Sequence, residues 1–220
     1  MPTPSRILIT SGPTREYLDP VRFLTNASSG RMGVALAEAV LQSGDVPVVV
    51  SGPISQSYPE GTEVHWIETT QQMLQCCELL FPNCEGAIGA AAPCDFKPVL
   101  FSEQKLAKTD LATEFLLRLE PTPDVLAALG QRKRPDQWIL GFALETQNGR
   151  KRALEKLRRK NCNMIVLNGP ESIDQDNASV EVFDASGNRI TVIDGTKRQI
   201  ANELLKCREL IRRHNKNRKI

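Results

Sequence analysis

A long polar segment, residues 11–33, constrains the fold most, because it separates two apolar stretches of different period. Before it, Ile7, Leu8 and Ile9 form a short continuous apolar run, which predicts a buried β-strand. After it, apolar residues recur at positions 32, 35, 36, 39 and 40, and this spacing predicts an amphipathic helix. The N-terminal part is therefore expected to run strand, long loop, helix.

The predicted helix start has the composition of an anion site. Ser28 and Ser29 are candidate N-caps, and Gly30 and Gly33 would let a ligand approach the backbone closely. Backbone N–H groups and the helix dipole at such a start favour an anion, although a Ser-Ser-Gly start is also explained by capping alone.

The loop before this helix carries Arg15, Asp19, Arg22 and Asn26. Connections from strand to helix usually take only a few residues, and long ordered loops tend to be functional. We therefore expect the loop to belong to a binding or catalytic site.

The rest of the chain alternates apolar runs with segments of helical spacing. Runs at 46–50, 64–67, 86–89, 138–143 and 162–167 predict strands of an α/β, Rossmann-like fold, with an open, mostly parallel sheet and helices on both faces. Residues 179–183 and 189–193 flank a Ser-Gly-Asn turn and predict a C-terminal β-hairpin. Residues 97–120 break the alternation and predict a flap or arm. We expect one domain over residues 1–220.

Two observations argue against an NAD-dependent dehydrogenase. No Gly-x-Gly-x-x-Gly turn follows the first strand, and the second strand ends at Val50-Ser51-Gly52 without an acidic residue for a ribose hydroxyl.

Composition excludes other classes. The 28 Lys and Arg against 26 Asp and Glu give a net charge of +2, which argues against a nucleic-acid binder. The sequence shows neither a membrane-spanning run nor a signal peptide, so a cytoplasmic protein without a membrane partner is predicted. The six cysteines form no Cys-x-x-Cys pair and there are only two histidines, so we expect reduced thiols and no protein-held metal.

Two further features leave alternatives open. Arg152, Lys156 and Lys160 recur every four residues on a predicted helix, where either solvent or a bound anion would offset their repulsion. Phe142, at the end of a predicted strand, either flanks a nucleobase or belongs to the core.

Several motifs in this order resemble the phosphopantothenate–cysteine ligase family, also called phosphopantothenoylcysteine synthetase. They are residues 12–16 (Gly-Pro-Thr-Arg-Glu), 19–22 (Asp-Pro-Val-Arg), 26–33 (Asn-Ala-Ser-Ser-Gly-Arg-Met-Gly), 89–96 (Gly-Ala-Ala-Ala-Pro-Cys-Asp-Phe), 105–108 (Lys-Leu-Ala-Lys), 121–126 (Pro-Thr-Pro-Asp-Val-Leu), 141–146 (Gly-Phe-Ala-Leu-Glu-Thr) and 166–168 (Val-Leu-Asn). The sequence departs from the family at two places. The family's Lys-x-Lys-Lys is Lys-Leu-Ala-Lys here, so that only Lys105 carries over securely, and Cys94 replaces a small residue, most simply as a small apolar substitute.

The resemblance implies a ligase of coenzyme A biosynthesis that joins 4′-phosphopantothenate to L-cysteine through an acyl-nucleotide. CTP is predicted over ATP as co-substrate, with Mg²⁺ on the triphosphate. The chain begins almost at its first strand, which predicts a stand-alone ligase without the FMN-dependent decarboxylase to which many bacterial members are fused. The alternatives are an ATP-using variant and a non-catalytic nucleotide-binding protein of the same fold.

The resemblance also implies roles for individual residues. Lys105 would favour acyl-nucleotide formation, and Asn26 its conversion to the amide. Arg22 would reach the substrate phosphate in a neighbouring subunit, and the arm would contribute to a dimer contact, so that a homodimer is predicted. The expected nucleotide-binding residues are Ser28, Gly30, Gly33, Gly89, Ala90, Ala91, Asp95, Lys105, Pro123, Asp124, Val125, Leu126, Phe142, Lys156, Lys160 and Asn168, and the expected substrate-binding residues are Arg22, Asn26, Ala91, Ala92 and Asp95.

Overall fold

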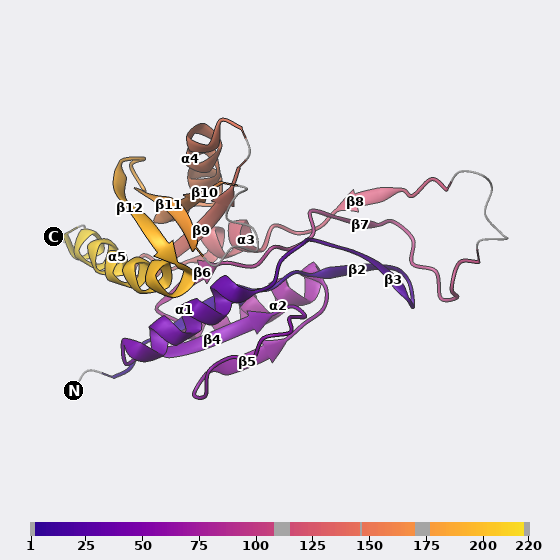
Figure 1. Cartoon of the computed structure of the whole chain (residues 1–220), viewed down its shortest axis with the longest axis horizontal. Coiled ribbons are helices and arrows are strands. Elements are labelled where there is room, and N and C mark those ends of the chain that lie inside the picture. Colours follow the sequence, from indigo (N-terminus) through magenta and orange to yellow (C-terminus); the bar gives the residue numbers. More distant parts are fainter. Residues whose placement is uncertain (1–2, 108–114, 146, 170–176, 218–220) are drawn as a thin grey trace.

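The structure, a computed structural model, describes residues 3–107, 115–145, 147–169 and 177–217 (Figure 1). Its centre is an eight-stranded sheet in the order β12-β11-β10-β9-β6-β1-β4-β5. The strands are β1 (Arg6–Ser11), β4 (Val46–Ser51), β5 (Glu63–Trp66), β6 (Gly86–Gly89), β9 (Trp138–Leu144), β10 (Met164–Asn168), β11 (Asn177–Asp184) and β12 (Arg189–Thr196). The first six pair in parallel, and β11 and β12 add an antiparallel hairpin at one edge. The predicted α/β, mostly parallel sheet and C-terminal hairpin are confirmed.

Helices cover both faces of the sheet, as predicted. One face packs against α1 (Arg31–Gln42) and α5 (Lys197–Asn217), and the other against α2 (Thr70–Leu80), α3 (Val125–Arg132) and α4 (Gly149–Arg159). A short 3-10 turn (Phe81–Asn83) follows α2. The apolar run of β1 explains the two layers: Ile7 and Ile9 face the α1 side, Leu8 faces the α2 side, and all three are fully buried.

The segment predicted as a loop, residues 11–33, contains a β-hairpin of β2 (Arg15–Asp19) and β3 (Arg22–Thr25), so the loop prediction is wrong in part. The rings of Tyr17 and Phe23 meet edge to face at 5.4 Å between centroids. At the turn, the buried carboxylate of Asp19 accepts the N–H groups of Val21 and Arg22, both at 2.9 Å. The ring contact joins the two strands and the Asp19 contacts fix the turn, so both stabilise the hairpin. Charged residues in these strands interrupt the apolar pattern by which a sequence predicts a strand.

The predicted excursion is confirmed as an arm that leaves the sheet (Figure 1). Its root is a two-stranded ribbon of β7 (Phe96–Pro98) and β8 (Leu119–Pro121). Residues 115–118 form no strand, and β8 begins at Leu119. Residues 108–114, which include Lys108 of the lysine motif, lie outside the described residues.

The start of α1 also differs from the prediction. Gly30 is its N-cap, in a left-handed conformation (φ 73°), and no side chain caps the helix, so neither Ser28 nor Ser29 does. A Cβ at Gly30 would lie 2.5 Å from Cγ2 of Ile54, which gives this glycine a steric as well as a conformational reason. Within the part of the chain that is described, no helix is both long and apolar enough to span a membrane.

Candidate active site

A cavity of about 1380 Å³ opens at the carboxyl ends of β1, β6, β9 and β10. The chain runs outward from β1 to β4 and β5, then returns on the other side of β1 to form β6, β9 and β10. Open α/β sheets bind ligands where the strand order reverses in this way. Thr10 of β1 and Gly89 of β6 line the cavity at that reversal.

The loop after β6 forms one wall, and its small side chains leave the cavity open. The N–H of Ala90 donates to the carbonyl of Thr10 at 3.1 Å, and the N–H of Ala91 to the hydroxyl of Thr10 at 3.3 Å. The N–H of Ala92 donates to the carbonyl of Gly12 at 2.9 Å. The loop is therefore tied to the end of β1 along its length, and Asp95 lies in the cavity wall directly after it.

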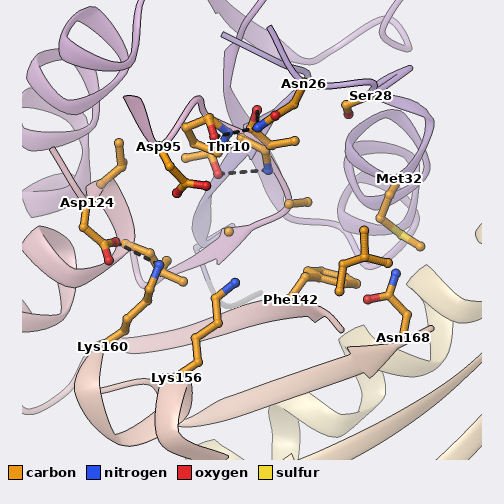
Figure 2. A pocket seen from close by; sticks show the side chains of 18 of the residues that line it. Thr10, Asn26, Ser28, Met32, Asp95, Asp124, Phe142, Lys156, Lys160 and Asn168 are labelled. Atoms are coloured by element: carbon orange, nitrogen blue, oxygen red, sulfur yellow. Dashed lines mark hydrogen bonds and ion pairs between the residues drawn. The ribbon is translucent and has the colours of Figure 1, made fainter. Parts of the chain in front are cut away.

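Asn26 follows β3 and reaches the same loop (Figure 2). Its side-chain amide donates to the carbonyl oxygens of Ala92, at 3.3 Å, and Pro93, at 2.9 Å. In this structure Asn26 thus anchors the loop while it lines the cavity.

Helix α4 brings positive charge to the opposite wall. Nζ of Lys160 lies 2.9 Å from Oδ1 of Asp124, the N-cap of α3, whereas Lys156 forms no ion pair with the residues described. Burial acts to raise the pKa of Asp124, but the contact with Lys160 and the N–H of Ala127 outweigh it and hold that pKa below its usual value. The pKa of Lys156 is lowered, first by burial and then by the charge of Lys160, against the opposing effect of Glu145 and Asp124. Lys156 is therefore the less compensated cation of the pair.

The far end of the cavity is more apolar. Figure 2 shows Met32, Phe142 and Asn168 grouped on one side of the cavity, with Phe142 between Lys156 and Asn168 in this view. Phe142 lines the cavity and also packs against the core on the α1 side, so the two interpretations of this ring are compatible. Ala178 and Val180 of β11 complete this end.

Most of the predicted site residues meet in this cavity. Its lining includes Asn26, Ser28, Gly30, Gly89, Ala90, Ala91, Ala92, Asp95, Pro123, Asp124, Val125, Leu126, Phe142, Lys156, Lys160 and Asn168.

Three predicted residues lie outside the lining. Gly33 packs α1 against β1, where a Cβ would lie 1.9 Å from Oγ of Ser11. The guanidinium of Arg22 pairs with Oδ2 of Asp19 at 3.0 Å and donates to the carbonyl of Leu106, next to Lys105. Arg22 and Lys105 are thus brought together on the hairpin and arm, away from this chain's own cavity.

Sequence reasoning missed other lining residues, chiefly Thr10, Arg31, Met32, Ala178, Val180 and Lys197. Met32 and Arg31 stand inside the recognised motif at the start of α1 and could have been included. No sequence pattern indicated that Ala178, Val180 and Lys197 line the cavity, because only the tertiary position of the C-terminal elements brings them to it.

Cys94 is buried, and its thiol contacts the carbonyl oxygens of Thr14 and Leu24, each at 3.5 Å. Burial raises the pKa of this thiol. These observations support its interpretation as a small apolar substitute rather than a nucleophile. Among the described residues, no group of three or more His, Cys, Asp or Glu side chains is placed to hold a metal.

Comparison with known proteins decides the family. Residues 3–210 match the family described as DNA/pantothenate metabolism flavoprotein C-terminal domain. The chain belongs to this family. A prokaryotic member named cysteine/cysteine sulfinic acid decarboxylase is 40% identical over 191 residues, covering 86% of this chain and 51% of its own. The coenzyme A biosynthesis bifunctional protein CoaBC of Bacillus subtilis is 38% identical over 197 residues, covering 88% and 46%. The chain thus spans about half the length of these curated relatives.

Two solved structures agree with the fold. The C-terminal domain of a CoaBC protein superposes with a TM-score of 0.78 at 37% identity, covering 94% of this chain and 95% of that one. A Cab2 mutant, H337A, solved in complex with phosphopantothenate-cysteine, has a TM-score of 0.75 at 19% identity and covers 96% of this chain and 87% of its own; at that identity it supports the family fold alone.

Proposed function

We propose that this chain is a phosphopantothenate–cysteine ligase of coenzyme A biosynthesis, active in the cytoplasm. The observation that carries the proposal is the cavity itself. It is large enough for a nucleotide together with a second substrate, it lies where the sheet reverses its strand order, and it joins a cationic wall to a loop of small residues. The motif resemblance and the name of the CoaBC relatives support the same pathway.

The reaction has two steps. A carboxylate oxygen of 4′-phosphopantothenate would attack the α-phosphorus of the nucleoside triphosphate and expel pyrophosphate. The amine of cysteine would then attack the acyl carbon, lose a proton and expel the nucleoside monophosphate. Mg²⁺ would neutralise the triphosphate, and because the described residues show no protein metal cluster, we propose that it is held mainly by the phosphate oxygens.

The geometry suggests how the residues share this work. Lys156 would face the phosphates, beside Lys160 and its partner Asp124, with the N–H groups around Ser28 and Gly30 on the other wall. The ring of Phe142 and the side chain of Asn168 would frame the base end, and Asp95 would accept from a hydroxyl or amide of the pantothenate moiety.

Arg22 and Lys105 suggest a homodimer. Both lie outside this chain's cavity yet adjoin each other on the hairpin and arm. A second copy whose cavity received this arm would gain one cation for the substrate phosphate and one for the reacting phosphate. We propose that the working unit is such a dimer.

The second candidate is a non-catalytic nucleotide-binding protein, favoured by the missing middle lysine at Ala107. Cysteine-dependent release of nucleoside monophosphate separates the two. The assay should run CTP and ATP side by side, with and without phosphopantothenate; we expect turnover with CTP. Binding of either nucleotide without pyrophosphate release under all conditions would contradict ligase activity.

A further inference from the structure

None of residues 12–16, the motif Gly-Pro-Thr-Arg-Glu, lines the cavity. Its threonine, Thr14, is fully buried and does not line the cavity. Thr70, the first residue of α2, is also fully buried, and the two hydroxyl oxygens lie 2.8 Å apart. A buried pair of hydroxyls between a hairpin and a distant helix calls for a reason beyond packing.

Both hydroxyls engage the backbone of Cys94. The N–H of Cys94 donates to Oγ1 of Thr14 at 2.8 Å, and Oγ1 of Thr70 donates to the carbonyl of Cys94 at 3.4 Å. Because the hydroxyl of Thr70 donates its proton to that carbonyl, the hydroxyl of Thr14 is the donor in the hydrogen bond between the two threonines. The contacts therefore close a ring, from the Cys94 N–H through two hydroxyls and back to the Cys94 carbonyl, and such chains polarise one another.

Neighbouring contacts fix the ring on three elements. Oε1 of the buried Glu16 accepts the N–H of Thr70 at 2.8 Å, which holds the start of α2 against the hairpin. The hydroxyl of Thr25 donates to the carbonyl of Thr14 at 2.8 Å. The hydroxyl of Thr122, which lies between β8 and α3, also donates to the carbonyl of Cys94.

Residue 94 directly precedes Asp95, which lines the cavity and whose carbonyl accepts the N–H of Thr122 at 3.0 Å. We propose that Thr14 and Thr70 are positioning residues: through their shared ring they hold the backbone of Cys94 and so set the place of Asp95 in the cavity. The consequence for substrate rests on the proposed function; the clamp itself does not.

The thiol of Cys94 is a natural probe of the clamp. It is 6% exposed although residue 94 lines the cavity, so a loosened loop should speed its reaction with a thiol reagent. Cys77 and Cys162 are also buried, in the core on the α2 side of the sheet, and serve as internal controls. Alkylation of each cysteine is followed by mass spectrometry of peptides from the folded chain.

Thr14→Val and Thr70→Val each keep the side-chain shape and remove one member of the ring. Each should speed alkylation of Cys94 about tenfold, the effect of one lost buried hydrogen bond, with Cys77 and Cys162 unchanged. The double variant should also stay near about tenfold rather than a hundredfold, because one break already opens the ring. Thr14→Ser, which keeps the hydroxyl, should remain within about threefold of wild type.

Alkylation of Cys94 at the wild-type rate in both valine variants would overturn the proposal. So would a parallel rise at Cys77 and Cys162, which would make the threonines general supports of the fold, or multiplicative effects in the double variant. In the ligase assay, Thr14→Val should raise KM for phosphopantothenate more than it lowers kcat, and Thr14→Ser should restore it. Absence of wild-type turnover would count against the proposed function and leave the alkylation result standing.

Discussion

Lys156 and Lys160 differ in how far a neighbouring carboxylate compensates their charge, and this difference can be tested by substitution. Lys160 is neutralised by Asp124 at 2.9 Å, whereas Lys156 is half-buried with no ion pair among the described residues. Lys156→Met should therefore remove a full charge from the phosphate subsite. A hydrogen bond to a charged group contributes about 1.5–3 kcal/mol, so nucleotide affinity should fall roughly 10- to 150-fold.

The effect of Lys160→Met should have another origin, because it leaves the Asp124 carboxylate uncompensated beside the phosphates. Adding Asp124→Asn should restore affinity to within about threefold of wild type, since asparagine also caps a helix well. The same Asp124→Asn change should not rescue Lys156→Met.

Isothermal titration calorimetry with CTP and with ATP, each with Mg²⁺, measures all four variants. Equal losses for Lys156→Met and Lys160→Met, with no recovery from Asp124→Asn, would refute the argument and make Lys160 a direct phosphate ligand.

Further predictions concern the pH dependence of Lys156, the Arg208–Asp45 ion pair, Lys105 and Asn26. The pKa of Lys156 is lowered by burial and by the charge of Lys160, so its positive charge is present at low pH and is lost as pH rises through that lowered pKa. Nucleotide affinity should therefore decline at a lower pH than the pKa of an ordinary lysine. Lys156→Arg should remove this decline. The buried Arg208 pairs with the partly buried Asp45 at 2.6 Å, so Arg208→Met should lower the free energy of unfolding in urea by about 3 kcal/mol or less. Arg208→Met with Asp45→Asn should lower it clearly less, and equal costs would contradict a charge effect. Lys105→Gln should slow pyrophosphate release in the absence of cysteine by about 10²-fold or more, and an unchanged rate would make Lys105 a surface charge. Asn26→Asp replaces an amide donor with a negative charge opposite two carbonyl oxygens, so quenched reactions should contain accumulated acyl-nucleotide by mass spectrometry, and full turnover without it would leave Asn26 a structural residue.

The order of strands and helices could be predicted because apolar runs alternate along the chain with segments of helical spacing. Residues 46–50 are four valines and one proline, and they form β4. The segment that begins at Gly149 forms α4, and its Lys156 lines the cavity. Position at the carboxyl edge of a parallel sheet then follows from topology, and both Phe142 and Asn168 line the cavity at that edge.

Features that depend on contacts between distant residues could not be predicted in the same way. The β2–β3 hairpin is stabilised by the Tyr17–Phe23 ring contact and by Asp19 at its turn, neither of which a periodicity analysis detects. Gly33 was interpreted as a phosphate contact, yet its surroundings show a tight approach of α1 to Ser11. Local sequence identifies a glycine that must stay small, but not the neighbour that requires it.

The antiparallel hairpin at the sheet edge has a consequence for biogenesis. Ala178 and Val180 of β11 and Lys197 of α5 line the cavity together with Thr10 of β1, so the complete wall requires both the first strand and the C-terminal elements. A ligand present at a hundredfold excess over its Kd stabilises the folded state that binds it by about 2.7 kcal/mol. Only chains that have folded through β11 would gain this stabilisation. Substrate supply would in that way favour survival of complete molecules over partial ones during quality control.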